Sequence, residues 1–131
     1  MHAERRAREL LRSVIPSDDW RSYEELGFIS VPGRGDAASG YAYLVYPQRP
    51  LIAYDTATGR LLSEYCARFR DDDERLPDAD DVLAKWLALR GRERELIGTA
   101  NVHPPGRQLD PDHVRRDLDR LSAWRDATMR A

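Results

Sequence analysis

Apolar residues recur at helical spacing over the first 27 positions, and this pattern predicts two helices. Pro16 ends the first helix, since proline disfavours helical geometry in the residue before it. Ser17 is expected to cap the second helix, and Gly27 to end it. The apolar face of the first helix comprises Ala3, Ala7, Leu10, Leu11 and Val14. The second presents Trp20, Tyr23 and Leu26. Together they predict a helical hairpin over residues 1–27.

The pattern changes to that of β-strands over residues 28–70. Between the last two strands, Asp55 is expected to accept backbone hydrogen bonds and Gly59 to take a positive φ. The expected strands are residues 28–31, 41–46, 51–54 and 61–69. The second is apolar on both faces, which predicts that both faces are covered. On the last strand, one face is expected to carry Leu61, Tyr65, Ala67 and Phe69, with Ser63 as its polar exception. Short connections require antiparallel pairing, so we expect a four-stranded β-meander.

Helical spacing returns over residues 76–131. A strong apolar stripe begins at Val82 and resumes beyond Gly91 as far as Ala100, which predicts either one bent helix or two short ones. After a loop at residues 103–106, Asp110 as cap and Pro111 as first residue predict a last helix. Its expected inner face is Val114, Leu118, Leu121 and Thr128, with Trp124 on the flank. The fold class is therefore α+β: one domain over residues 1–131, with two to three C-terminal helices after the sheet.

Composition excludes several classes of protein. Cys66 is the only cysteine, so the chain has no intrachain disulfide and no cysteine-based zinc site. It has no apolar run long enough for a signal peptide or a membrane span, and we expect it in the cytoplasm. The net charge of −2 and the pI near 5.9 argue against attraction of nucleic acid by the whole surface. Lys85 is the only lysine among 21 basic residues, an arginine bias typical of GC-rich coding in a bacterium or its phages.

No catalytic or cofactor signature stands out, and no cofactor or metal is predicted. The three histidines lack the close paired spacing of zinc ligands. Cys66 has no neighbouring base or cation in the sequence to activate it. Asp78, Asp80 and Asp81 resemble a magnesium-binding carboxylate cluster, but the helix dipole favours acidic residues in a first turn anyway. A small metal-dependent hydrolase or nuclease using these aspartates is the weakest of three hypotheses.

The leading hypothesis is a non-catalytic protein that binds another protein. Its candidate contact residues are Trp20, Trp86, Trp124, Arg115, Arg116 and Arg120, since tryptophan and arginine are frequent interface anchors. The alternative is nucleic-acid binding, through the arginine-bearing last helix or by stacking and phosphate contact on the sheet. The sheet candidates are Tyr41, Tyr43, Arg49, Arg60 and Arg68. The sequence leaves the partner and the oligomeric state open, and it predicts no membrane association.

A set of short motifs resembles a group of small bacterial and phage proteins. The motifs are the Asp55…Gly59 hairpin, Cys66 near a strand end, Leu76-Pro77-x-x-Asp80, Leu83-Ala84 and Ala100-Asn101. The resemblance covers residues 17–103, and the helix after Pro111 looks like an addition. It implies no activity. It implies that Cys66 and the Ala100-Asn101 pair belong to one architectural unit, and it favours a prophage or mobile-element origin.

Overall fold

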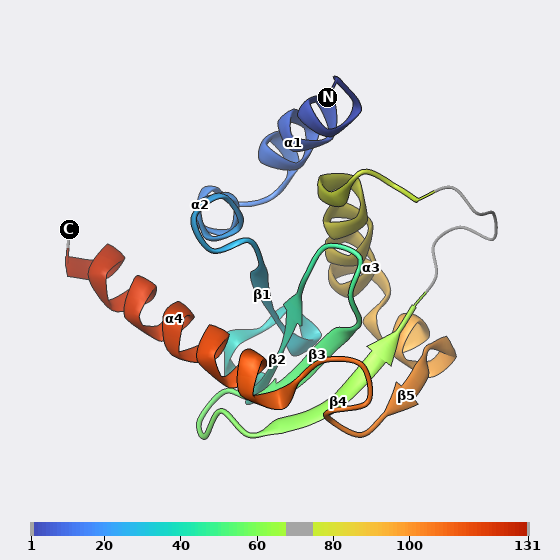
Figure 1. The fold of residues 1–131 in the computed structure, drawn as a ribbon, viewed down its shortest axis with the longest axis vertical. Helices are drawn as coiled ribbons and strands as arrows, with labels where there is room; N and C mark the ends of the chain where they lie inside the picture. The colour runs from blue at the N-terminus through green and yellow to red at the C-terminus, as the bar shows by residue number, and fades with distance from the viewer. Residues whose placement is uncertain (1, 68–74, 131) are drawn as a thin grey trace.

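A five-stranded antiparallel sheet forms the centre of the computed structural model, which describes residues 2–67 and 75–130 (Figure 1). The strands lie side by side in chain order: β1 (Ile29–Pro32), β2 (Tyr41–Val45), β3 (Leu51–Asp55), β4 (Leu61–Cys66) and β5 (Asn101–His103). The helices are α1 (His2–Val14), α2 (Ser17–Leu26), α3 (Asp78–Thr99) and α4 (Pro111–Arg130), with short turns η1 (Gly33–Gly35) and η2 (Ala37–Ser39). The α+β class and the order of helices, strands and helices are confirmed.

The predicted number of strands is wrong, because β5 adds a fifth to the meander. Val102 of β5 pairs with Tyr65 of β4, and the pairs on either side are Glu64 with His103 and Cys66 with Asn101. A helix end and a loop were predicted for these residues. Three residues are too few to show the alternation that marks a strand. This strand forms because the outer edge of β4 offers unpaired backbone groups to residues 101–103.

Helices cover both faces of the sheet. One face packs against α1, α2 and α3, and α4 packs on the other face, passing in front of β1 and β2 in the view of Figure 1. The core on the α3 side includes Ile29, Val31, Tyr43, Val45, Leu51 and Ala53. The core on the α4 side includes Ala42, Leu44, Tyr46, Ile52 and Tyr54. Successive residues of β2 thus alternate between two cores, which confirms that this strand is covered on both faces.

An irregularity in β4 corrects the face predicted for the last strand. The register shifts between Ala53 and Tyr54, so that their partners are Ser63 and Leu61, with Leu62 as an extra residue. An extra residue exchanges the faces of the residues on its two sides. As a result, Leu61 packs with the α4-side core while Tyr65 packs with the α3-side core. Of the other residues expected on that face, Phe69 lies outside the described residues.

At the helix ends, the structure confirms one predicted cap and contradicts another. Asp110 accepts a hydrogen bond from the Asp112 amide (3.0 Å), which confirms it as the cap of α4. The residues after Gly91 form one helix with a bend, since Arg92 inside α3 has φ −147° and ψ 43°. The Ser17 cap is wrong: α2 begins at Ser17 itself, after Pro16, without a side-chain cap. No helix of the described residues is long and apolar enough to cross a bilayer.

Candidate functional site

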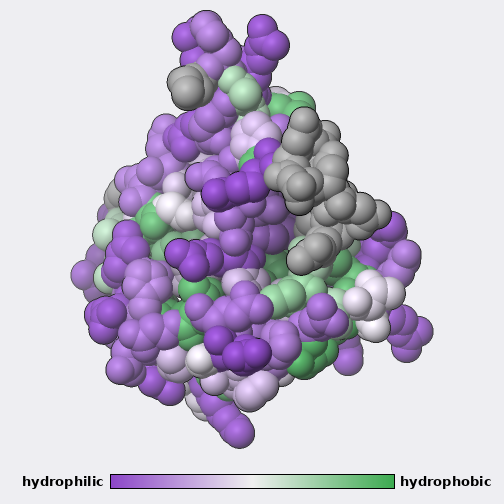
Figure 2. Space-filling model, turned by 45° about the vertical axis from the view of Figure 1, so that its right-hand side comes forward, coloured by the Kyte–Doolittle hydropathy of each residue, from purple (hydrophilic) through white to green (hydrophobic). Residues whose placement is uncertain are grey.

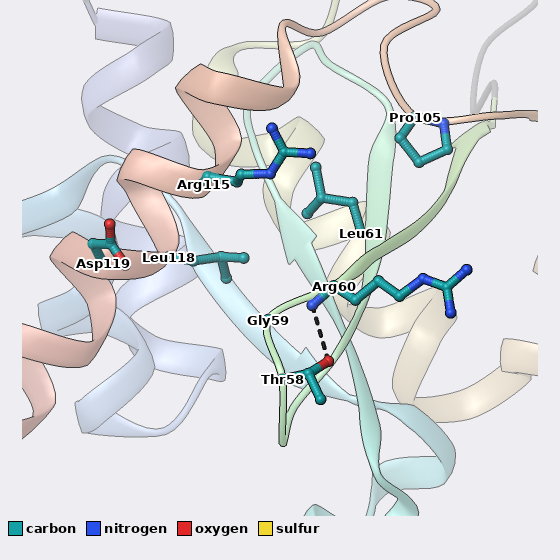
Figure 3. Close-up of a pocket in the computed structure, with 8 residues that line it drawn as sticks. All are labelled: Thr58, Gly59, Arg60, Leu61, Pro105, Arg115, Leu118 and Asp119. Carbon is teal, nitrogen blue, oxygen red and sulfur yellow. Dashed lines mark hydrogen bonds between the residues drawn. The ribbon is translucent and has the colours of Figure 1, made fainter.

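A groove of about 570 Å³ lies between the β3–β4 turn, the loop after β5 and α4 (Figure 3). Two arginines from separate elements line it, Arg60 from the turn and Arg115 from α4. In Figure 3 the side chain of Leu61 lies between these two arginine side chains, and Leu118 extends from α4 toward the turn. The remaining lining residues are Thr58, Gly59, Pro105 and Asp119. The groove thus combines an apolar floor with two guanidinium groups.

The β3–β4 turn holds Arg60 in place through a network centred on Asp55. The Asp55 carboxylate accepts hydrogen bonds from the amides of Ala57 (2.8 Å) and Thr58 (2.9 Å). These two bonds lower the pKa of Asp55 below its usual value, and the bond from the Thr58 amide contributes most. Gly59 has φ +75°, as predicted, and its amide bonds to the Asp55 carbonyl. The Arg60 amide donates to Thr58 Oγ1 (3.2 Å), so the backbone that carries this guanidinium is fixed.

The wall formed by Pro105 depends on a buried carboxylate on β4. Glu64 is 1% exposed and accepts three backbone N–H groups from the loop between β5 and α4. Its Oε1 accepts the amide of Gln108 (2.9 Å), and its Oε2 accepts those of Gly106 (3.1 Å) and Leu109 (3.2 Å). Glu64 therefore ties the loop and the start of α4 to the sheet. Glu64 was not among the predicted site residues, although a charged side chain in the middle of a predicted strand was a visible signal.

The electrostatics of the groove favour an anionic ligand. Arg115 forms an ion pair with Asp112 (2.9 Å), but both side chains are more than half exposed, so the pair is worth only about 0–1 kcal/mol. Arg115 can therefore exchange this partner for a ligand at little cost. Asp119 is the one carboxylate among the lining residues. Arg60 was a candidate on the sheet and Arg115 a candidate on the last helix, and the fold brings them to one groove.

The three tryptophan candidates do not form a common surface. Trp20 is 9% exposed, and the Arg8 guanidinium lies 5.2 Å from its ring centroid. Trp86 is half-buried on α3 with Arg90 over its ring. Trp124 is half-buried on α4, and its Nε1–H donates to Glu25 Oε2 (2.7 Å). Trp20 is thus the most deeply placed of the three, whereas Trp124 borders a cleft at the end of α4.

The other two arginine candidates on α4 differ in their surroundings. Arg116 is exposed and does not line the groove. Arg120 donates to Asp117 Oδ1 (2.7 Å) and lies 6.0 Å from the ring centroid of Phe28. Asp117 is buried and also accepts the Tyr46 hydroxyl (2.8 Å), so this group fastens α4 to the sheet. Arg120 therefore has a structural partner.

The tyrosines proposed for nucleic-acid stacking lie largely inside the protein. Tyr43 is 3% exposed, Tyr41 is half-buried, and both hydroxyls donate to Glu93 Oε2 (2.6 and 2.7 Å). Burial raises the pKa of Glu93, but hydrogen bonds from Tyr43, Tyr41 and the Arg34 amide outweigh it, and its pKa lies below the usual value. Arg49 is exposed on the turn after β2. Arg68 lies outside the described residues.

The three aspartates at the start of α3 have separate environments. Asp81 is buried and accepts hydrogen bonds from Lys85 Nζ (2.6 Å) and the Gln48 amide (2.8 Å). Asp78 is exposed and Asp80 is half-buried. Within residues 2–67 and 75–130, no group of three or more His, Cys, Asp or Glu side chains is placed to hold a metal ion. The magnesium-cluster interpretation therefore has no geometric support in this part of the chain.

Cys66 and the only lysine border a smaller pocket of about 200 Å³. Lys85 Nζ donates to the carbonyls of Tyr46 (3.0 Å) and Arg49 (2.8 Å) as well as to Asp81. Burial lowers the pKa of Lys85, although Asp81 opposes the shift. All three ammonium protons have acceptors, so Lys85 acts as a clamp on the β2–β3 turn. The Cys66 thiol accepts a hydrogen bond from Gln108 Nε2 (2.9 Å).

The face of the molecule drawn in Figure 2 is mostly hydrophilic. Figure 2 shows a face on which apolar side chains form small patches separated by polar ones. The exposed large apolar residues are Leu10, Val14, Leu62, Leu87, Val102 and Met129. Leu10 and Val14 belong to the apolar face predicted for the first helix, but only Ala7 and Leu11 of that face enter the core. Comparisons with protein-family models, curated proteins and solved structures found no match to this chain.

Proposed function

We propose that this chain is a non-catalytic binding protein whose groove between the β3–β4 turn and α4 takes an acidic segment of a protein partner. The observation that carries the proposal is the placement of Arg60 and Arg115 on separate elements around the apolar Leu61 and Leu118. The single cysteine and the arginine bias of the chain support a location in the cytoplasm of a bacterium or a phage-infected cell.

An acidic peptide fits this groove better than a small inorganic anion. Guanidinium groups form forked hydrogen bonds with carboxylates. The floor of Leu61 and Leu118 offers apolar contact to the side chains between those carboxylates, which an inorganic ion lacks. Asp119 adds an acceptor for a peptide N–H. A ligand that alternates carboxylate and apolar side chains therefore matches the lining of the groove.

Nucleic-acid binding is the second candidate, and its support is weaker. A stacking platform requires aromatic faces at the surface. Tyr43 and Tyr54 are nearly inaccessible, and their hydroxyls bond to Glu93 and Ser30 respectively. On α4, aspartates alternate with the arginines, and such mixed signs suit a protein partner better than a continuous phosphate backbone. The metal-dependent enzyme is the third candidate, and the separate environments of Asp78, Asp80 and Asp81 count against it.

The test is fluorescence anisotropy with a labelled peptide of alternating Glu and Leu. We expect saturable binding that weakens as salt rises, because salt screens exposed charges. The matched peptide with Gln in place of Glu should bind poorly. Arg60→Gln and Arg115→Gln should each weaken binding about tenfold, the loss expected for a charge-assisted hydrogen bond.

Arg116→Gln is the matched control, because Arg116 neighbours Arg115 on α4 but does not line the groove. It should leave the affinity nearly unchanged. Equal losses for all three variants would show that only net charge matters, and the proposed site would be wrong. Tighter binding of a labelled single-stranded or duplex oligonucleotide, with the steep salt dependence of counterion release, would favour the second candidate.

A further inference from the structure

A second, more enclosed cleft lies between α2 and the C-terminal half of α4. It has a volume of about 300 Å³, near the lower end of the range for ligand sites, so it suits a single side chain. Helix α2 contributes Asp18 and Asp19. Its α4 wall consists of Leu121, Trp124, Arg125, Thr128 and Met129. Figure 1 shows this end of α4 extending beyond the sheet on the side of α2.

The charges around this cleft favour a cation. Its lining has two carboxylates, Asp18 and Asp19, against one guanidinium, that of Arg125. In the described part of the chain, Arg125 forms no ion pair with either aspartate. Burial raises the pKa of Asp19, opposed by a hydrogen bond from the Trp86 side chain and by Arg125. The Asp19 carboxylate is thus partly desolvated and forms no ion pair among the described residues, so an added cation would stabilise it.

The polar floor of the cleft is already satisfied. The hydroxyl of Ser22 donates to the Phe28 carbonyl (2.8 Å), and that of Ser30 shares a hydrogen bond with Tyr54 (2.7 Å). These serines therefore offer a ligand little, and recognition depends on the two aspartates and on Trp124. The hydrogen bond from Trp124 Nε1–H to Glu25 fixes that ring in orientation. A fixed ring beside two carboxylates is a suitable setting for an aromatic contact with a cation.

The other two tryptophans show which cation this protein places on an indole ring. The Arg8 guanidinium lies 5.2 Å from the ring centroid of Trp20, and the Arg90 guanidinium lies 5.7 Å from that of Trp86. Among the residues described, Trp124 has no guanidinium over its ring in this way. A planar guanidinium can stack on an aromatic face while its N–H groups bond to carboxylates, which an ammonium group does less well.

From these observations we infer that the cleft between α2 and α4 binds the arginine side chain of a protein partner, with its guanidinium on Trp124 and bonded to Asp18 and Asp19. The apolar stem of that side chain lies along Leu121 and Met129, the latter of which is 85% exposed. This site uses none of the side chains of the groove at Arg60 and Arg115. Either site can therefore fail its test without affecting the other.

The experiment is an NMR titration that follows the three tryptophan indole N–H signals, with Trp124→Phe used to assign the third. The probe is acetyl-arginine methylamide, which presents the side chain as a peptide does. We expect a saturable shift of the Trp124 signal and little change for Trp20 and Trp86. The uncharged citrulline analogue should not shift it, and the lysine analogue should bind more weakly. Free arginine, which carries a charged amino and a charged carboxyl group, is a further probe. It should bind no more tightly than acetyl-arginine methylamide if the cleft takes the side chain of a peptide rather than a free amino acid.

Asp18→Asn and Asp19→Asn should each weaken probe binding about tenfold. Asp126→Asn is the matched control, since Asp126 is exposed on α4 outside the cleft and should change nothing. Because Asp19 is half-buried, the exposed Asp18 carries the test if the Asp19 variant loses its fold. The inference is overturned if the Trp124 indole signal does not shift, or if the citrulline or lysine analogue binds as tightly as the arginine probe. Tighter binding of free arginine than of the arginine probe would also overturn it. So would an Asp126→Asn variant that weakens binding as much as the Asp18 and Asp19 variants do.

Discussion

Replacing Glu64 by glutamine tests how the groove is held together. The carboxylate accepts three backbone N–H groups at 2.9, 3.1 and 3.2 Å, and hydrogen bonds to a charged group contribute about 1.5–3 kcal/mol each. A glutamine side chain has one acceptor oxygen and one NH₂ group. In one orientation the NH₂ group faces the Gln108 amide, and in the other it faces the amides of Gly106 and Leu109. At least two donors, one backbone N–H and the NH₂ group itself, then lack acceptors.

The magnitude follows from these contacts. A buried donor without a partner costs about 1–3 kcal/mol, and the bonds that remain weaken because the acceptor is neutral. Part of this loss in stability is offset, because glutamine is neutral and burying a charge is unfavourable. We therefore expect Glu64→Gln to lower the free energy of unfolding by about 3 kcal/mol, or the melting temperature by about 10 °C.

Urea unfolding followed by circular dichroism measures this change. Glu95→Gln is the control, because Glu95 lies exposed on α3 in a surface ion pair with Arg92, and it should cost under about 1 kcal/mol. The same loss should also loosen Pro105 and weaken binding of the acidic peptide. A Glu64→Gln variant as stable as the control would refute the reasoning, because the three contacts would then contribute nothing net.

Three further results are expected from the same structure. Lys85→Met leaves the Asp81 charge buried without its partner, so it should lower the free energy of unfolding by about 3–5 kcal/mol in a urea titration. Gly33→Ala places a methyl group 2.0 Å from the Tyr41 ring, so it should destabilise the protein by about 1–3 kcal/mol in the same assay. Burial raises the pKa of Tyr23 to about 12. The Glu4 charge adds to this shift, and the Arg8 charge opposes it. The pKa of a tyrosine is near 10 in the unfolded chain. The neutral phenol therefore makes its full contribution to the free energy of unfolding below pH 10, and this contribution is lost as the pH rises toward 12. A pH series of melting curves checks this.

Matched variants give each of these results a clear alternative. Gly98→Ala on α3 has open space for the added methyl group and should leave stability unchanged or raise it by up to about 1 kcal/mol. A Gly33→Ala variant that behaves the same way would mean that Tyr41 moves freely. A Lys85→Met cost below about 1 kcal/mol would contradict the clamp. Tyr23→Phe should reduce the loss of stability above pH 10, and an unchanged profile would contradict the role of that phenol.

Local sequence signals predicted the elements that neighbouring residues determine. The Asp55…Gly59 turn was expected to use the Asp55 carboxylate and a positive φ at Gly59, and both features are present. Asp110 was expected to cap the last helix, and it does. Such features depend on groups only a few residues apart, so the chemistry of the turn or cap is visible in the sequence itself.

Contacts between distant residues were not predictable in this way. Glu64 accepts hydrogen bonds from backbone amides that lie more than 40 positions away in the sequence. Glu93 accepts hydrogen bonds from the hydroxyls of Tyr41 and Tyr43, which lie 50 or more positions away. The extra residue Leu62 exchanges two faces of β4, which no alternation pattern shows. The groove itself arises because the loop tied by Glu64 brings α4 beside the β3–β4 turn. Its two arginines were therefore predicted as candidates on separate elements and not as one site.

The most direct test of the account is a map of backbone amide shifts on addition of the acidic Glu–Leu peptide. The account predicts that the largest shifts fall in two segments that are distant in sequence, residues 58–61 and 115–119. The shifts should saturate together, giving one dissociation constant, and should disappear in the Arg60→Gln, Arg115→Gln double variant. Shifts spread evenly over α4, or centred on another face, would contradict a binding site in this groove.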